Sequence, residues 1–289
     1  MKYFIVDVFS KNKYSGNQLA VVFLSSSLSE MEMQTIANEF HFSETTFVYP
    51  QKNDDGSYRV RIFTPNNEVP FAGHPVLGTA CIIRKELEKN NPNVINLSLK
   101  IGTISVTFDD TKNIQWMKQI EPIFGSNYKA KDIAEIIGVR EEEIDVRYPI
   151  QEVSTGINFL LVPLRNLNAN KKARVDLTKY KAFFKENIEL PIFIYSKETY
   201  EQENDFNCRM FADTLGIPED PATGSANGCF AAYLSKYEIL GSKNINVKVE
   251  QGYEINRKSI LHLRTQYESK KYNIEVGGKV IKIAEGDLK

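Results

Sequence analysis

Two segments rich in small residues, about half a chain apart, each stand directly ahead of an apolar stretch with helical spacing. They are residues 63–79 (FTPNNEVPFAGHPVLGT) and residues 219–227 (EDPATGSAN). Because the first backbone N–H groups of a helix have no partner within that helix, each segment can present them to an anionic ligand. One such segment is ordinary, but two of them suggest a pair of related lobes that bind one small acid.

Matched spacing indicates an internal repeat. Phe63, Pro70 and Cys81 are separated by 7 and 11 residues, and the same residue types recur at the same intervals 148 positions later, as Phe211, Pro218 and Cys229. This offset is close to half of the 289 residues. We therefore expect an internal duplication, and the length of the chain independently favours two domains.

The charge balance argues against nucleic acid as a partner. Lys and Arg together number 36 and Asp and Glu number 37, so the chain lacks the excess of cations that neutralises a phosphate backbone. No stretch approaches the roughly 18 to 20 apolar residues of a membrane span. The N-terminal apolar run is interrupted at Asp7 and is predicted to be a strand rather than a signal peptide.

The three cysteines, at positions 81, 208 and 229, have no metal-ligand spacing. A sparse, odd number of cysteines in a chain of this length is typical of reduced thiols in an intracellular protein. We therefore expect a cytoplasmic protein with no metal site and no membrane partner.

Apolar periodicity predicts many strands and few helices. Strands are expected at residues 2–9, 19–24, 45–49, 58–63, 94–99, 103–108, 114–118, 158–162, 191–195, 207–211, 245–250, 260–264, 272–276 and 280–284. Helices are expected at residues 30–40, 76–89, 131–137, 177–185 and 225–237. The second and fifth of these helices begin apolar on most sides, which indicates that each runs through the middle of a sheet.

The predicted fold is α+β, with two pseudo-symmetric lobes that each wrap a barrel-like mixed sheet around a central helix. We expect an N-terminal lobe over residues 1–120 and a C-terminal lobe over residues 121–276, with a break in the pattern within residues 116–130. Residues 277–289 could return to the first lobe, and the sequence leaves this open.

Two residues of the first lobe could carry chemistry. Glu44 stands at the mouth of a predicted strand among apolar neighbours, where partial desolvation would raise its pKa toward the range of a general base. A surface turn is the alternative for this position. His74 lies between Gly73 and Pro75 near a helix start, where the helix dipole favours a neutral imidazole, although a structural histidine bonded to a loop carbonyl fits equally well.

The loop DPATGS is the candidate of the second lobe. Asp220 could orient a substrate hydroxyl or amine, while Gly224 and Ser225 bind a carboxylate. A plain turn followed by a helix capped by Thr223 would use similar residues. The sequence has no GxGxxG after a strand, no GxxxxGK[ST], no HExxH and no GxSxG, so nothing local supports a nucleotide site, a zinc hydrolase or a serine esterase.

Four motifs in order, MKYFIVDVFSKNKYSGNQLAVV, SETTF, FTPNNEVPFAGHPVLGTA and EDPATGSANG, resemble the PhzF-like (phenazine biosynthesis) family, which has the diaminopimelate epimerase fold. The resemblance implies an active site in a cleft between two lobes, no metal or organic cofactor, and a homodimer. It places the general acid/base of the SET motif on Glu44. It assigns substrate binding to Gly73, His74, Asp220, Gly224 and Ser225.

The sequence also departs from related enzymes. Epimerases and racemases of this fold use two cysteines, whose places are taken here by Ala72 and Pro221 or their neighbours, which disfavours inversion through thiols. Gln18 and His41 stand where the family often has Pro and Asn, so the substrate could differ from that of the phenazine enzyme.

The sequence thus predicts a cofactor-independent isomerase in which Glu44 moves a proton between carbons of a small carboxylic acid. An amino-acid or hydroxy-acid epimerase or racemase, and a small-acid-binding protein without catalysis, remain the alternatives. Neither the identity of the substrate nor a part in phenazine synthesis follows from these residues.

Overall fold

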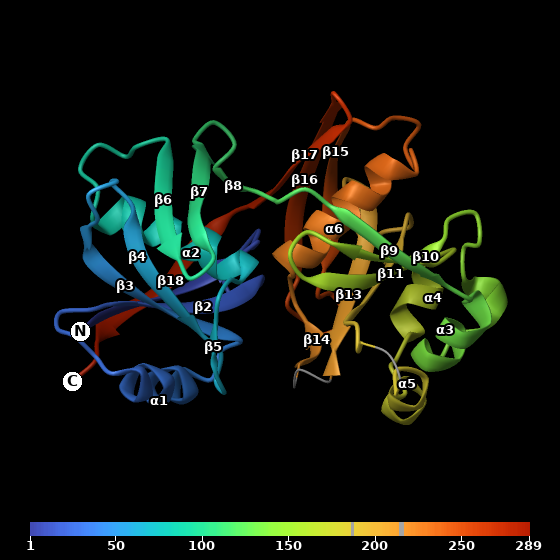
Figure 1. Cartoon of the computed structure of the whole chain (residues 1–289), viewed down its shortest axis with the longest axis horizontal. Coiled ribbons are helices and arrows are strands. Elements are labelled where there is room, and N and C mark those ends of the chain that lie inside the picture. Colours follow the sequence, from blue (N-terminus) through green and yellow to red (C-terminus); the bar gives the residue numbers. More distant parts are fainter. Residues whose placement is uncertain (186–187, 214–216) are drawn as a thin grey trace. The chain divides into compact units, whose positions relative to one another are not determined.

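The structure is a computed structural model that describes residues 1–185, 188–213 and 217–289. The chain divides into two compact units. The first consists of Met1–Lys118 together with Gly277–Lys289, and the second of Gln119–Val276. Each unit is described by itself below (Figure 1).

The first unit is a mixed sheet around one long helix. Its elements are β1 (Lys2–Val8), β2 (Asn17–Phe23), α1 (Glu30–Phe40), β3 (Glu44–Lys52), β4 (Tyr58–Phe63), β5 (Glu68–Val69), α2 (Gly73–Glu86), β6 (Val94–Leu99), β7 (Gly102–Asp109), β8 (Ile114–Lys118) and β18 (Val280–Asp287). The sheet runs β18, β1, β2, β3, β4, β6, β7, β8; the pairs β2/β3 and β4/β6 are parallel and the others antiparallel. The short β5 pairs with β4.

Helix α2 is the core of the first unit. It contacts β1, β2, β3, β6, β7, β8 and β18 (Figure 1), and every residue from its first to Arg84 is buried. A Cβ placed on Gly78 would lie 2.6 Å from a methyl carbon of Leu19 and 2.9 Å from one of Val8. Only glycine therefore allows the backbone of the helix to approach β1 and β2 this closely.

The second unit has the same plan with extra helices. Its elements are β9 (Ile123–Tyr128), α3 (Ala130–Ile137), the 3₁₀ turn η1 (Glu141–Glu143), β10 (Ile150–Ser154), β11 (Asn158–Pro163), α4 (Leu167–Lys172), α5 (Leu177–Phe183), β12 (Ile192–Ser196), β13 (Phe206–Ala212), β14 (Ile217–Asp220), α6 (Gly224–Lys236), β15 (Ile245–Gln251), β16 (Ser259–Glu268) and β17 (Lys271–Gly278), in which the chain returns to the first unit. Helix α6 is buried from its first residue to Ser235 and contacts β10, β11, β15 and β16.

The two units repeat one order of strand pairing. In the first unit β1/β2 is antiparallel, β2/β3 parallel, β3/β4 antiparallel, β4/β6 parallel and β6/β7 antiparallel. In the second unit β10/β11, β11/β12, β12/β13, β13/β15 and β15/β16 follow in the same sequence of directions. Phe63 and Phe211 occupy the equivalent strands β4 and β13. The predicted fold class, two pseudo-symmetric lobes around central helices, is confirmed.

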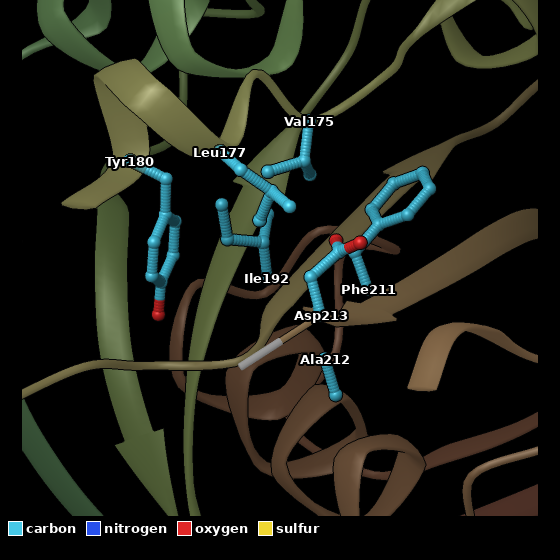
Figure 2. A pocket seen from close by; sticks show the side chains of 7 residues that line it. All are labelled: Val175, Leu177, Tyr180, Ile192, Phe211, Ala212 and Asp213. Atoms are coloured by element: carbon cyan, nitrogen blue, oxygen red, sulfur yellow. The ribbon is translucent and has the colours of Figure 1, made fainter. Parts of the chain in front are cut away.

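A separate apolar cluster in the second unit joins α3 and α5 to β10–β13. A small cavity at its edge is lined by Val175, Leu177, Tyr180, Ile192, Phe211, Ala212 and Asp213 (Figure 2). The cavity has room for about one water molecule. It is therefore too small to serve as a substrate site.

The five predicted helices are all present; α1 has the predicted bounds, and the other four have ends shifted by one to three residues. Helix α2 begins at Gly73 rather than at residue 76, because Pro75 stands in the first turn, where a helix does not use the missing N–H. The short elements β5, β9, β10, β14 and α4 were not predicted. The division between the two units falls after Lys118, within the range 116–130 in which the boundary was expected. Within that range β9 forms by pairing with β10 despite its Gly, Ser and Asn.

Candidate active site

In the first unit Glu44 and His74 lie beside each other. Glu44 is the first residue of β3, opposite Leu19 of β2, and its side chain is 14% exposed. His74 is the second residue of α2, with a side chain 6% exposed. The distance between His74 Nε2 and Glu44 Oε2 is 3.3 Å. The first turn of α2 therefore holds the imidazole beside the carboxyl group at the start of β3, and the alternative of a surface turn at Glu44 is excluded.

The surroundings of His74 favour a neutral ring. Burial lowers the pKa of His74 to about 3, against a smaller opposing effect of a hydrogen bond to the Gln18 backbone. A neutral imidazole has one N–H and one unprotonated nitrogen, so Nε2 and the Glu44 carboxyl can form a hydrogen bond when either of them carries a single shared hydrogen. Burial therefore favours the neutral imidazole that was expected near a helix start.

In the second unit Asp220, Gly224 and Ser225 lie within one turn of chain. Asp220 ends β14 and is 6% exposed, and Gly224 and Ser225 are the first two residues of α6. The hydroxyl of Thr223 donates to Asp220 Oδ2 at 2.5 Å. Thr223 does occupy the N-cap position, but its side chain makes no capping hydrogen bond, so the predicted cap is wrong. The Thr223 hydroxyl bonds the Asp220 carboxylate and not a backbone N–H group of the first turn of α6.

Both central helices begin without a side-chain cap. The N-cap residues are Ala72 for α2 and Thr223 for α6, and neither side chain accepts a hydrogen bond from the first turn. The N-terminal end of a helix carries a partial positive charge together with unpaired N–H groups. The N–H groups of the first turns, at Gly73 and His74 and at Gly224 and Ser225, are therefore suited to an anion such as a carboxylate.

The cysteines do not take part in either group. Cys81 lies inside α2 and Cys229 inside α6, and both are buried. Burial raises the pKa of the Cys229 thiol to about 12, which keeps it protonated near neutral pH. Ala72 directly precedes α2, and Pro221 is the first residue of the loop between β14 and α6. The observed placement agrees with the expectation that thiols do not act as bases here.

The two positions at which the sequence departs from the resembled family lie differently. His41 is exposed at the end of α1, in the left-handed conformation with φ 54°. The side chain of Gln18 is exposed, while its backbone bonds the ring of His74. Gln251, a fully buried residue that bonds the DPATGS loop, was not among the predicted site residues. Its one local signal is the following Gly252, which adopts φ +76° at the end of β15.

Comparisons with known proteins identify the family. Residues 6–286 match the family model described as "Phenazine biosynthesis-like protein" (PhzC-PhzF). An uncharacterized isomerase, mll1393, from Mesorhizobium japonicum is 31% identical to this chain, and the alignment covers 99% of this chain and 98% of the relative. The trans-2,3-dihydro-3-hydroxyanthranilate isomerase of Pseudomonas aeruginosa is 30% identical, with 99% and 98% coverage.

A solved structure agrees with these sequence matches. The crystal structure of a Bacillus anthracis phenazine biosynthesis protein of the PhzF family superimposes with a TM-score of 0.90 and 27% identity, covering 100% of this chain and 99% of that one. None of the helices among the described residues is long and apolar enough to cross a membrane. With the repeated fold and the four motifs in place, the chain belongs to the phenazine biosynthesis-like (PhzC-PhzF) family, a family of isomerases.

Proposed function

We propose that the protein moves a proton between two carbons of a small carboxylic acid, with Glu44 as the general acid and base and without a metal or organic cofactor. The observation that carries this proposal is the pairing of Glu44 with a buried, neutral His74 at 3.3 Å. A carboxyl group held in place and largely shielded from water is suited to take a proton from carbon and return it. A protein that only binds an acid has no need of such a pair.

The remaining candidate residues would bind and orient the substrate. Asp220 and His74 would position the reacting part, while Ser225 and the backbone N–H groups of Gly73 and Gly224 would bind its carboxylate. The relative from Pseudomonas aeruginosa is named for a cyclic amino acid, trans-2,3-dihydro-3-hydroxyanthranilate. We propose small cyclic or aromatic acids of this kind as the substrate class.

The main alternative is an epimerase or racemase. Such an enzyme exchanges the hydrogen at one stereocentre with inversion, whereas the proposed isomerase shifts a double bond. Buried cysteines in the middle of α2 and α6 count against a pair of thiol bases. The NMR spectrum of the product formed in D₂O separates the two reactions, because it reports both the position of the new C–D bond and that of the double bond.

Substitution Glu44→Gln tests the proposal. We expect turnover to fall by about 10²- to 10⁴-fold, since the amide cannot transfer the proton, with substrate affinity little changed. Thermal-shift screening of small cyclic acids first identifies a ligand, and calorimetry then compares its binding to both proteins. Glu39→Gln, an exposed carboxyl group on α1, is the matched control. Full activity of the Glu44 variant on a true substrate would refute the assignment.

The predicted homodimer is a further proposal from family resemblance. Light scattering coupled to size-exclusion chromatography measures the molar mass directly, and the 33.0 kDa of one chain is the reference for a monomer.

A further inference from the structure

All the hydrogen bonds that the Gln251 side chain can form go to the loop that carries Asp220 and to the first turns of α6. Gln251 ends β15 and its side chain is 0% exposed. Gln251 Nε2 donates to the Asp220 carbonyl oxygen at 2.9 Å and to Thr223 Oγ1 at 3.2 Å. Gln251 Oε1 accepts from Thr223 N at 3.3 Å and from Asn227 Nδ2 at 2.9 Å. A carboxamide has two donors and two lone pairs, and all four are engaged here.

These bonds lead from Gln251 to the Asp220 carboxylate through one hydroxyl group. Thr223 Oγ1 accepts from Gln251 and donates its single hydrogen to Asp220 Oδ2 at 2.5 Å. The direction of donation is therefore set along the whole chain of bonds. Gln251 also bonds the Asp220 carbonyl oxygen and the Thr223 N–H, so it holds the backbone from which both of these side chains project.

The same carboxamide holds the first turn of α6. Asn227 is 0% exposed and its Nδ2 bonds both Gln251 Oε1 and the Thr223 carbonyl oxygen, the latter at 3.0 Å. The backbone after Gln251 also fits the loop closely: at Gly252, with φ +76°, a Cβ would lie 2.6 Å from the Pro221 carbonyl oxygen. The loop before α6 and the first turn of α6 are thus both hydrogen-bonded to the last residue of β15.

We propose that Gln251 is a positioning residue for the reaction, which fixes the Asp220 carboxylate and the first N–H groups of α6 without touching the substrate. This inference rests on the proposed function, because it needs Asp220 and the start of α6 to bind substrate. A displacement of about 1 Å in a positioning contact costs about 10²-fold in rate.

The test is a comparison of Gln251→Ala with Gln151→Ala. Gln151 is a matched control, since it is 5% exposed in the same unit and bonds Gly125, Lys236 and Tyr237 through the same kind of carboxamide. We expect kcat/KM to fall by about 10- to 100-fold for Gln251→Ala and by less than about threefold for Gln151→Ala. Equal losses in the two variants would overturn the proposal, because a structural effect of a lost buried amide would then explain both.

A double-mutant cycle with Thr223→Val identifies the route of the effect. If Gln251 acts on Asp220 through the Thr223 hydroxyl, then Thr223→Val alone lowers kcat/KM, and its combination with Gln251→Ala lowers it by clearly less than the product of the two single losses. Combination with Gln151→Ala gives the full product. Wild-type kcat/KM for Thr223→Val would overturn the proposal even if Gln251→Ala fails to fold, which circular dichroism reports.

The activity of the Glu44→Gln variant distinguishes failure of the proposed function from failure of the positioning role of Gln251. If that variant stays active, the proposed function fails whatever Gln251 does. If it is inactive while Gln251→Ala matches its control, the proposed function stands and the positioning role of Gln251 fails.

Discussion

At the scale of the residue, His74 makes stability depend on pH. Its pKa is lowered from 6.5 to about 3 in the folded chain, mainly by burial. Between these values the unfolded chain takes up a proton that the folded chain does not, so stability is fully present above pH 6.5 and is lost as pH falls toward 3. We expect His74→Asn to flatten this limb by up to about 1.4 kcal/mol per pH unit, as measured by urea unfolding at pH 7, 6, 5 and 4.

His41→Asn is the control for this measurement, because His41 is exposed at the end of α1. That variant should keep the wild-type dependence of unfolding free energy on pH. An unchanged acid limb in His74→Asn would mean that the ring is protonated in the folded chain, and the neutral role assigned to His74 would then be wrong.

At the scale of the element, a buried ion pair joins β13 to β14, the strand that ends at Asp220. Arg209, with a side chain 1% exposed, donates from Nε and Nη2 to both oxygens of Glu219 at 2.9 and 2.7 Å. Removal of one partner leaves an uncompensated buried charge. We expect Arg209→Met to lower the free energy of unfolding by about 3 to 5 kcal/mol, measured by urea denaturation of the full chain.

The matched control is Arg264→Met. Arg264 pairs with Glu275 at 2.5 Å in the same unit, but its side chain is 41% exposed. An exposed pair contributes about 0 to 1 kcal/mol. A loss in the Arg209 variant no greater than that of this control would show that burial of the pair does not matter for β13 and β14.

At the scale of the whole molecule, the last strand completes the first unit. β18 pairs with β1 from Lys2↔Asp287 to Val8↔Val280, and Met1 and Leu288 exchange two backbone hydrogen bonds of 2.8 Å. Deletion of residues 280–289 would leave one edge of β1 without a partner. We expect hydrogen exchange to speed up across the first unit and much less in the second, as measured by mass spectrometry. Deletion of Lys289 alone is the control, and equal acceleration in both units would contradict the division of the chain.

Local pattern was enough to predict most helices and strands. The bounds of α1 follow from its sequence, because Ser29 and Glu32 form a capping box at its start. The strand β4 and the helices α2 and α6 follow from apolar runs bounded by turn residues. In contrast β5 has two residues and β14 has four, too few to form a recognisable period. Such strands form only because a neighbouring strand satisfies their backbone groups.

The candidate site also has a part that the sequence predicts and a part that only the tertiary structure provides. The sequence by itself determined the two-lobed plan and the residue types of the site, because the repeat and the small-residue loops are local patterns. Only the tertiary structure brought Glu44 to His74, gave that imidazole its low pKa, and set Gln251 beside Thr223, 28 positions away. Contacts and burial of this kind depend on how distant strands and helices pack, and no spacing along the chain encodes that packing.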